Sequence, residues 1–100
     1  MNSMPAQQDF LPLVDQPFTV TCNQQHQTMQ LTSVSELRHS GGYDSFSLTL
    51  RGLRRHALDQ GVYQLSHEQI CATHLLLVPI GATEDSIDYQ VVFSRRHEVA

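Results

Sequence analysis

Lysine and tryptophan are absent from this chain, and cysteine occurs only twice among its 100 residues. All six basic residues are therefore arginine, and the ten acidic residues leave a formal net charge of −4 at pH 7. Such a chain has no broad cationic field for a phosphate backbone, so we expect no nucleic-acid partner. Because the two cysteines, Cys22 and Cys71, accompany no export signal, we expect reduced thiols and a cytoplasmic location.

Long hydrophobic runs are also lacking. The longest, at residues 75–80, has the length of a core strand and falls far short of the roughly 20 apolar residues of a membrane-spanning helix. The first residues carry no basic residue and no extended apolar run, which argues against a signal peptide. We therefore expect no membrane partner. Hydrophobic residues still make up 40% of the chain, enough for a folded domain.

The polar residues have an unusual balance, with arginine as the sole cation and eleven glutamines. Protein interfaces are enriched in arginine and depleted in lysine, because the guanidinium group is weakly hydrated and planar. The same bias arises in a GC-rich genome, where arginine codons are favoured, so composition alone leaves both explanations open.

Apolar and polar residues alternate along most of the chain, which predicts β-strands. Six strands are expected, and they start near residues 18, 29, 46, 62, 75 and 87. The second strand is expected to contain a bulge near Val34, because Val34 breaks the alternation. It is expected to end before His39. Gly41 and Gly42 predict a tight hairpin turn, since glycine accepts positive φ angles.

The connections follow from the same pattern. The sequence NQQHQ at 23–27 predicts a turn, and residues 51–61 predict a polar connection anchored by Leu53 and Leu58. The run at 75–80 predicts a strand buried on both faces or one crossing under a helical turn. That turn is expected at 10–14, where the spacing of the apolar residues is helical.

These elements predict an all-β fold, a small six-stranded antiparallel barrel or sandwich with a short N-terminal helical turn. A single β domain is expected at 10–95, between a flexible tail at 1–9 and a C-terminal tail at 96–100. The predicted core comprises Phe18, Val20, Leu31, Phe46, Leu48, Leu50, Leu65, Leu76, Val78, Tyr89, Val91 and Phe93.

Motifs that carry common enzymatic chemistry are missing. The chain contains no G-x-x-x-x-G-K-S/T loop, no G-x-G-x-x-G and no G-x-S-x-G. Serine, histidine and aspartate are present, but a catalytic triad is defined by geometry and not by inventory. We therefore expect a protein that is not an enzyme and that needs no cofactor.

The strongest metal candidate lies in the sequence HEQICATH, where His67, Cys71 and His74 have helical spacing. The stretch lies between two predicted strands, however, and no neighbouring C-x-x-C supplies a fourth ligand, so we assign no metal site. The acidic residues Glu84, Asp85 and Asp88 lack the spacing of a calcium loop and predict a solvated hairpin tip.

The candidate binding residues are the basic and aromatic groups near predicted turns: Arg38, His39, Tyr43, Arg51, Arg54 and Arg55. The cluster at 51–56 could hold an anion or a partner, although it has no interleaved aromatic residues for single-stranded nucleic acid. Tyr43 beside the double glycine could serve as an aromatic anchor for a partner. Packing of Tyr43 within its own hairpin is the simpler alternative.

Five segments of the chain carry a family resemblance: LVDQPFTV, SVSELRHSGGYDSFSLTLRG, QGVYQLSHE, LLLVPIG and YQVVFSR. Together they resemble a family of short bacterial domains of unknown function, over residues 10–95. The resemblance implies an accessory component encoded among phage-tail-like genes, and it implies no activity. Family members have glycine where Asp15 stands and glycine near Cys71, so the Cys71 region is particular to this chain.

Three functions are consistent with these observations. The first is a structural or adaptor domain that binds a protein partner, or a second copy of itself, through strand edges or a sheet face, within a phage-tail-like particle. The second is a small-ligand module with a barrel mouth lined by His39, Tyr43, Tyr63 and His67. The third is a metal-dependent enzyme that uses the HEQICATH residues.

Overall fold

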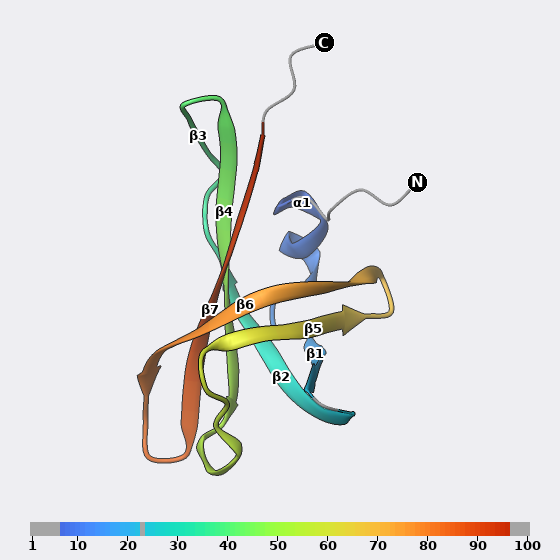
Figure 1. The fold of residues 1–100 in the computed structure, drawn as a ribbon, viewed down its shortest axis with the longest axis vertical. Helices are drawn as coiled ribbons and strands as arrows, with labels where there is room; N and C mark the ends of the chain where they lie inside the picture. Colours follow the sequence, from blue (N-terminus) through green and yellow to red (C-terminus); the bar gives the residue numbers. More distant parts are fainter. Residues whose placement is uncertain (1–6, 23, 97–100) are drawn as a thin grey trace.

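The computed structural model describes residues 7–22 and 24–96, and it is mostly β. A short helix opens the described chain, and seven strands follow (Figure 1). The elements are α1 (Gln7–Phe10), the 3-10 turn η1 (Leu11–Leu13), β1 (Pro17–Cys22), β2 (Gln25–Val34), β3 (Arg38–Ser40), β4 (Tyr43–Leu53), the 3-10 turn η2 (Arg54–His56), β5 (Gly61–His67), β6 (Ile70–Ala82) and β7 (Ser86–Arg96).

Six of the strands close into an antiparallel barrel. The strand order is β2-β1-β5-β6-β7-β4-β3, and an additional pairing of β2 with β4 closes the sheet on itself. The predicted all-β fold with six barrel strands and a helical turn is therefore confirmed, and of the two architectures considered the barrel is the one formed. The strand that the sequence did not predict, β3, lies outside the barrel and pairs with β4.

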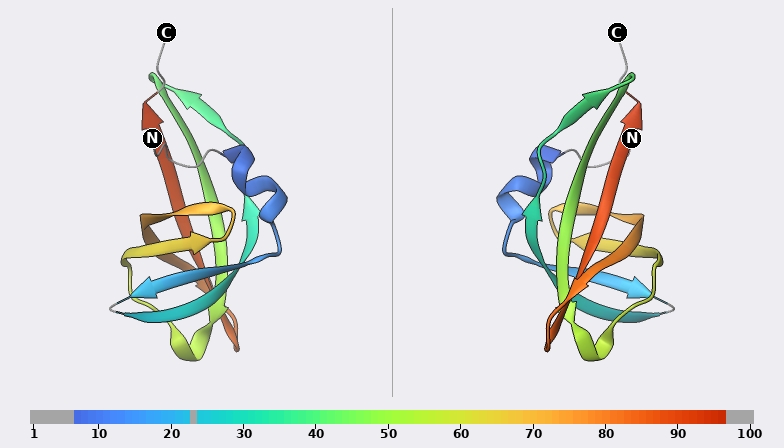
Figure 2. Two further views of the ribbon diagram at one scale, coloured as in Figure 1. Left: turned by 90° about the vertical axis from the view of Figure 1, so that its right-hand side faces the viewer. Right: turned by 90° about the vertical axis from the view of Figure 1, so that its left-hand side faces the viewer.

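Two of the barrel strands extend well beyond the barrel wall. β4 pairs with β7 over its whole length, from Tyr43↔Arg96 to Leu53↔Ser86. The pairing of β2 with β4 stops at Leu48, and the pairing of β6 with β7 stops at Gln90. We call the three-stranded extension the arm; it comprises β3, residues 43–47 of β4 and residues 92–96 of β7. Figures 1 and 2 show the arm standing past the crossing strands β5 and β6, in a molecule 46 Å long and 27 by 24 Å across.

The barrel interior is filled by apolar side chains, because every strand turns alternate residues inward. The buried core consists of Phe10, Leu13, Phe18, Val20, Met29, Leu31, Phe46, Leu48, Leu50, Leu65, Leu75, Leu77, Tyr89, Val91 and Phe93. The buried Tyr89 keeps its hydroxyl satisfied, since the Leu58 N–H donates a hydrogen bond of 2.8 Å to it. α1 and η1 contribute Phe10 and Leu13, which confirms that the N-terminal helical turn docks on the sheet.

Ten of the twelve predicted core residues are buried, and the prediction is wrong for the other two. Leu76 is 48% exposed and Val78 is half-buried, whereas Leu75 and Leu77 face the core. The strand at 75–80 is therefore not buried on both faces. A continuous apolar run has no alternation from which to choose the inward face, and a shift of one residue exchanges the two faces.

The second half of the chain's first hairpin also differs from expectation. β2 ends at Val34, and its bulge lies between Leu31 and Ser33. The predicted strand thus ends four residues earlier than expected, and residues 38–40 pair with β4 as an additional strand, β3, that the sequence did not predict. The predicted turn at 23–27 is much shorter, because Cys22 already pairs with Gln25.

The predicted hairpin at Gly41 and Gly42 is confirmed, with φ angles of +57° and +82° and Ser40 paired with Tyr43. In the predicted connection at 51–61, Leu58 packs against the core as expected, but Leu53 is 49% exposed because β4 continues through it. At the ends of the domain, residues 7–9 are helical and Arg96 belongs to β7. The remainder of both expected tails, 1–6 and 97–100, lies outside the described residues.

Candidate binding surface

The six predicted binding residues do not form one site. Arg38, His39 and Tyr43 lie on the β3–β4 hairpin at the tip of the arm, whereas Arg51 and Arg54–His56 lie at the other end of β4. Tyr43 and Arg51 are eight positions apart on one strand, about 26 Å at ~3.3 Å per residue. The structure therefore separates the candidates into a tip group and a base group.

The base group is largely engaged in holding the barrel together. Arg51 donates hydrogen bonds to both carboxylate oxygens of Asp88, from Nε at 2.8 Å and from Nη2 at 3.3 Å. The hydrogen bond from Arg51 and the nearby negative charge of Asp88 raise the pKa of the guanidinium above its ordinary value. Arg54 Nη1 donates to the Thr83 carbonyl at 3.0 Å, and Arg55 is exposed.

These contacts of the base group could not be predicted from the sequence, because the partners lie 29 and 37 residues away along the chain. Asp88, which the sequence places beside the acidic loop at 84–85, is an ion-pair partner of Arg51 and is half-buried. We therefore assign Arg51 to the pairing of β4 with β7, and Arg54 to holding η2 against the β6–β7 loop.

The tip group is presented to solvent. The His39 ring contacts the carboxylate of Asp44 through Nδ1, as expected for paired positions on neighbouring strands. Tyr43 follows the two glycines of the turn and is 51% exposed, so the structure does not bury it within its own hairpin. An exposed tyrosine at the end of a projecting hairpin is a suitable anchor for a protein partner.

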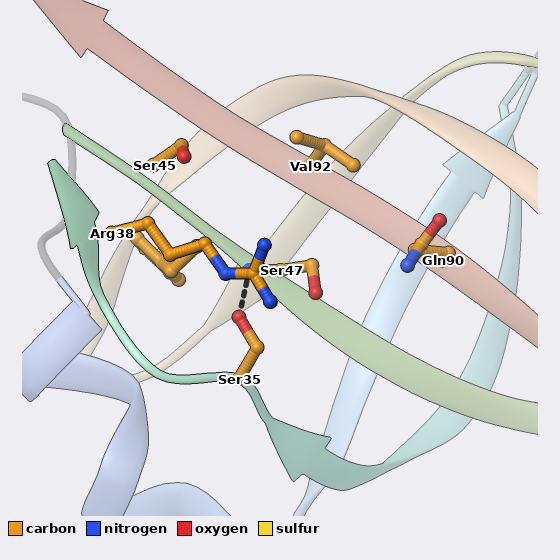
Figure 3. A pocket seen from close by; sticks show the side chains of 7 residues that line it. Ser35, Arg38, Ser45, Ser47, Gln90 and Val92 are labelled. Atoms are coloured by element: carbon orange, nitrogen blue, oxygen red, sulfur yellow. Dashed lines mark hydrogen bonds between the residues drawn. The ribbon is translucent and has the colours of Figure 1, made fainter. Parts of the chain in front are cut away.

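A shallow hollow lies on the outer face of the arm, where it joins the barrel (Figure 3). Three serines, Ser35, Ser45 and Ser47, belong to its lining, and the Arg38 side chain lies beside Ser35 and Ser47. Ser35 Oγ accepts a hydrogen bond of 2.7 Å from the Ser47 N–H, which continues the β2–β4 pairing past the end of β2. Val92 forms the apolar side of the hollow and is 60% exposed.

The metal candidates lie on the β5–β6 hairpin without converging. His67 faces Phe18, with ring centroids 4.8 Å apart, and its Nε2 lies 3.0 Å from Gln16 Oε1. His67 Nδ1 accepts the N–H of Gln69, and the exposed His74 pairs with Gln64 farther along the hairpin. The side chain of Cys71 lies outside the description. Among the described residues, no three histidine, cysteine or acidic side chains come together as a metal site.

The four residues considered for a ligand at the barrel mouth lie on three strands, in two separate parts of the fold. His39 and Tyr43 belong to the tip of the arm, and Tyr63 and His67 belong to β5, which pairs with β1 and β6. The Tyr63 hydroxyl donates to the Asp59 carbonyl at 2.7 Å. Burial of the ring raises the pKa of Tyr63, with smaller contributions from nearby charges.

A second hollow, at the opposite end from the arm, was not anticipated. Gln25, His26, Gln27, Thr28, Leu53 and His56 line it. Gln27 Nε2 donates to the His56 carbonyl at 2.9 Å, and His26 Nδ1 lies 2.8 Å from Thr21 Oγ1. The hollow brings the β1–β2 hairpin beside η2, a contact with no local sequence signal.

Strand edges are the most distinctive feature of the arm. Among the residues that the structure describes, β4 is the only strand that pairs with β7 beyond Gln90 and the only strand that pairs with β3. The arm therefore has an open edge on each side, three residues long at β3 and five residues long at β7. Sequence alternation predicts a strand but not which of its edges lacks a partner.

Exposed aliphatic side chains lie on three of the barrel strands. Val62 and Leu76 are cross-strand partners on β5 and β6, and both are about half or more exposed. Val92 lies on β7 beyond the pair of Val78 with Gln90, and it is 60% exposed. Of these three residues, Val92 belongs to the open edge of β7.

The fold and surface together define a small closed β-barrel with a projecting, open-edged arm. By sequence, the chain belongs to the family of the domain of unknown function DUF6916, whose model matches residues 5–93. No curated protein matches the chain, and neither does any solved structure. Within the described part of the chain, no helix has the length and apolar character needed to cross a membrane.

Proposed function

We propose that this chain is a non-enzymatic structural or adaptor domain that contacts other proteins through its arm, as an accessory component of a phage-tail-like assembly. The observation that carries the proposal is the length of β4 and β7 beyond the barrel wall, with open edges on both sides among the described residues. Closing the barrel does not require that length. An extended edge can accept a further strand through backbone hydrogen bonds.

The chemistry of the arm supports protein contact in particular. Tyr43 stands exposed at its tip, and arginine and tyrosine are the residue types enriched at the centres of protein interfaces. The chain also lacks lysine, which natural proteins use to keep exposed edges from pairing. The phage-tail-like setting is supported by the resemblance of the sequence segments alone.

The absence of enzymatic chemistry is part of the same proposal. The tip group and the base group lie at opposite ends of β4, too far apart to act on one substrate. Every buried side chain of the described core is hydrophobic. The alternative, a small-ligand module, remains a proposal without a specific observation in its favour, because the four residues named for it do not line one hollow.

The proposal is tested by affinity capture of the tagged full chain from its native host, followed by cross-linking and mass spectrometry. Tyr43→Ala is the test variant, and Leu53→Ala is its matched control. Both residues lie on β4 and are about half exposed, but Leu53 is at the end far from the arm. Neither side chain belongs to the buried core, so both variants should fold.

We expect assembly proteins in fixed proportion with the wild-type chain and with Leu53→Ala, and a clear loss with Tyr43→Ala. Equal recovery with both variants would show that the arm is not the contact surface. If a folded wild-type chain captures no protein, the proposed adaptor function is contradicted.

A further inference from the structure

We propose that two copies of this chain pair through the outer edge of β7, antiparallel to each other, across a two-fold axis that passes at Ser94. The pairing joins two arms into one continuous sheet. This inference rests on the proposed function, because it names a second copy as a partner of the same arm. It follows from the direction in which the backbone groups of β7 point.

The direction of the β7 backbone groups follows from hydrogen bonds on the side of β4 that faces away from β7. The Ser47 carbonyl accepts the N–H of Ser35 at 2.8 Å, and the Ser47 N–H donates to Ser35 Oγ at 2.7 Å. Thr32 Oγ1 also donates to the Thr49 carbonyl. The backbone groups of Ser47 and Thr49 therefore point away from β7, and those of the alternate residues Phe46 and Leu48 point toward it.

The same alternation carries over to β7. Phe46 pairs with Phe93 and Leu48 pairs with Val91, so these β7 residues direct their N–H and C=O groups to β4. The intervening residues, Val92, Ser94 and Arg96, direct theirs to the opposite side. Beyond Gln90, no described strand lies on that side to receive them. The edge thus offers three donors and three acceptors in a row.

One register of a second copy satisfies all of these groups. Placing Ser94 opposite Ser94 of the second copy also places Val92 opposite residue 96, in both directions. Every donor and acceptor at positions 92, 94 and 96 then has a partner in each copy. A register centred on Phe93 would place residue 96 opposite Gln90 of the second copy. Gln90 is already paired with Val78 of β6, so the backbone groups of residue 96 would have no partner.

A second copy fits this edge better than a head-to-tail arrangement. Pairing of β7 with β3 of another copy would use only three residues, since β3 spans Arg38–Ser40. Every strand pairing among the described residues is antiparallel, and a two-fold axis also pairs two β7 strands antiparallel to each other. In this register Ser94 faces Ser94, residue 93 faces residue 95 and residue 92 faces residue 96, so no two arginines lie directly opposite each other.

Apolar contact accompanies the backbone pairing. Hydrogen bonds alone seldom overcome the loss of translational and rotational freedom on association. Val92 is 60% exposed on the outer face of the edge strand itself, where the paired strand of a second copy would cover part of it. The edge and Val92 together form a self-complementary patch, which a two-fold interface requires.

The register is tested by disulfide trapping in the full chain with Cys22→Ser and Cys71→Ser. Ser94→Cys places two cysteines directly opposite across the axis, where paired Cα atoms lie about 5.5 Å apart, within reach of a disulfide. Val92→Cys is the matched control, because it is exposed on the same face of the same strand and faces residue 96. Sedimentation of the wild-type chain and of Ser94→Pro measures the association itself.

We expect the Ser94→Cys chain to form a covalent dimer about tenfold faster than Val92→Cys or more, because proximity raises the effective concentration. The wild-type chain should dimerise reversibly. Ser94→Pro should weaken the dimer about tenfold or more, since it removes an edge N–H without touching the β4 pairing. Equal trapping of both cysteines, or a wild-type chain that stays monomeric at the highest concentration reached, would overturn the pairing.

The test separates this inference from the proposed function. A monomeric wild-type chain that still captures host proteins in a Tyr43-dependent manner overturns the self-pairing and leaves the adaptor function intact. A trapped Ser94→Cys dimer with no captured host protein supports the self-pairing and removes the adaptor function. A foreign strand found on the β7 edge of a monomeric chain also overturns the self-pairing.

Discussion

The rings of Phe46 and Phe93 lie parallel, 4.7 Å apart between centroids and inclined by only 3°. These residues face each other across β4 and β7, at the base of the arm. Phe10 of α1 packs against both rings, at 5.9 Å and 5.2 Å. The helical turn therefore covers one end of the barrel. The aromatic cluster of Phe10, Phe46 and Phe93 also fixes the base of the arm, and with it the direction of the arm's edge.

Removal of this cluster should be costly. We expect Phe93→Ala to lower the free energy of unfolding by about 3 to 5 kcal/mol, the usual cost of truncating a buried phenylalanine. Val92→Ala, one residue away on the exposed face, should change it by only about 0.5 kcal/mol or less. Urea unfolding of both variants measures the difference. Similar losses for the two would mean that the inward face of β7 is misassigned.

Asp15 adopts a φ angle of +74° at the junction between η1 and β1, and its N–H donates a hydrogen bond of 2.6 Å to the Leu31 carbonyl. Side chains disfavour that left-handed conformation, which glycine adopts without strain. We expect Asp15→Gly to raise the free energy of unfolding by about 0.5 to 1 kcal/mol and Asp15→Ala to lower it by a similar amount. Thermal unfolding of the two variants measures the sign of each change in stability. A loss of stability in both variants would contradict backbone strain at Asp15.

Tyr63 should make stability fall at alkaline pH. Burial raises the pKa of its hydroxyl above the ordinary value of 10.0, with further contributions from Cys22, Asp59 and Tyr89. Above pH 10 the unfolded chain releases this proton while the folded chain retains it, so stability is present below pH 10 and is lost as pH rises through the folded pKa.

The dependence is measured as the melting temperature between pH 8 and pH 11, about one to two units on either side of an ordinary tyrosine pKa. Tyr63→Phe should flatten the decline, because it removes the hydroxyl whose pKa is raised in the folded chain. An identical decline in Tyr63→Phe and the wild-type chain would assign the effect to other groups.

Local alternation predicted most of the barrel, because a half-buried strand shows its inward face in its own sequence. Phe46, Leu48 and Leu50 are an example, and all three are buried. The prediction failed where the pattern was uniform, at Leu75–Val78, where only pairing with β5 and β7 selects the inward residues. It also failed at β3, which is too short to display a period.

Less of the binding surface than of the barrel could be predicted from the sequence. The turn at Gly41 and Gly42 correctly predicted a hairpin beside Tyr43, since that signal is local. The role of Arg51 was not visible, because Asp88 lies on another strand. The open edge of β7 depends on where β6 stops pairing, which is a property of the closed barrel and not of the residues 91–96 themselves.

Amide hydrogen exchange along β7, followed residue by residue by NMR, tests the central claim most directly. In dilute solution the account predicts slow exchange at Val91 and Phe93, which donate toward β4, and fast exchange at Val92 and Ser94, which face the open edge. Exchange at Val92 and Ser94 should slow as the concentration rises and the edge is covered. Slow exchange at both positions in the dilute chain would show that the edge is already occupied, and it would contradict the account.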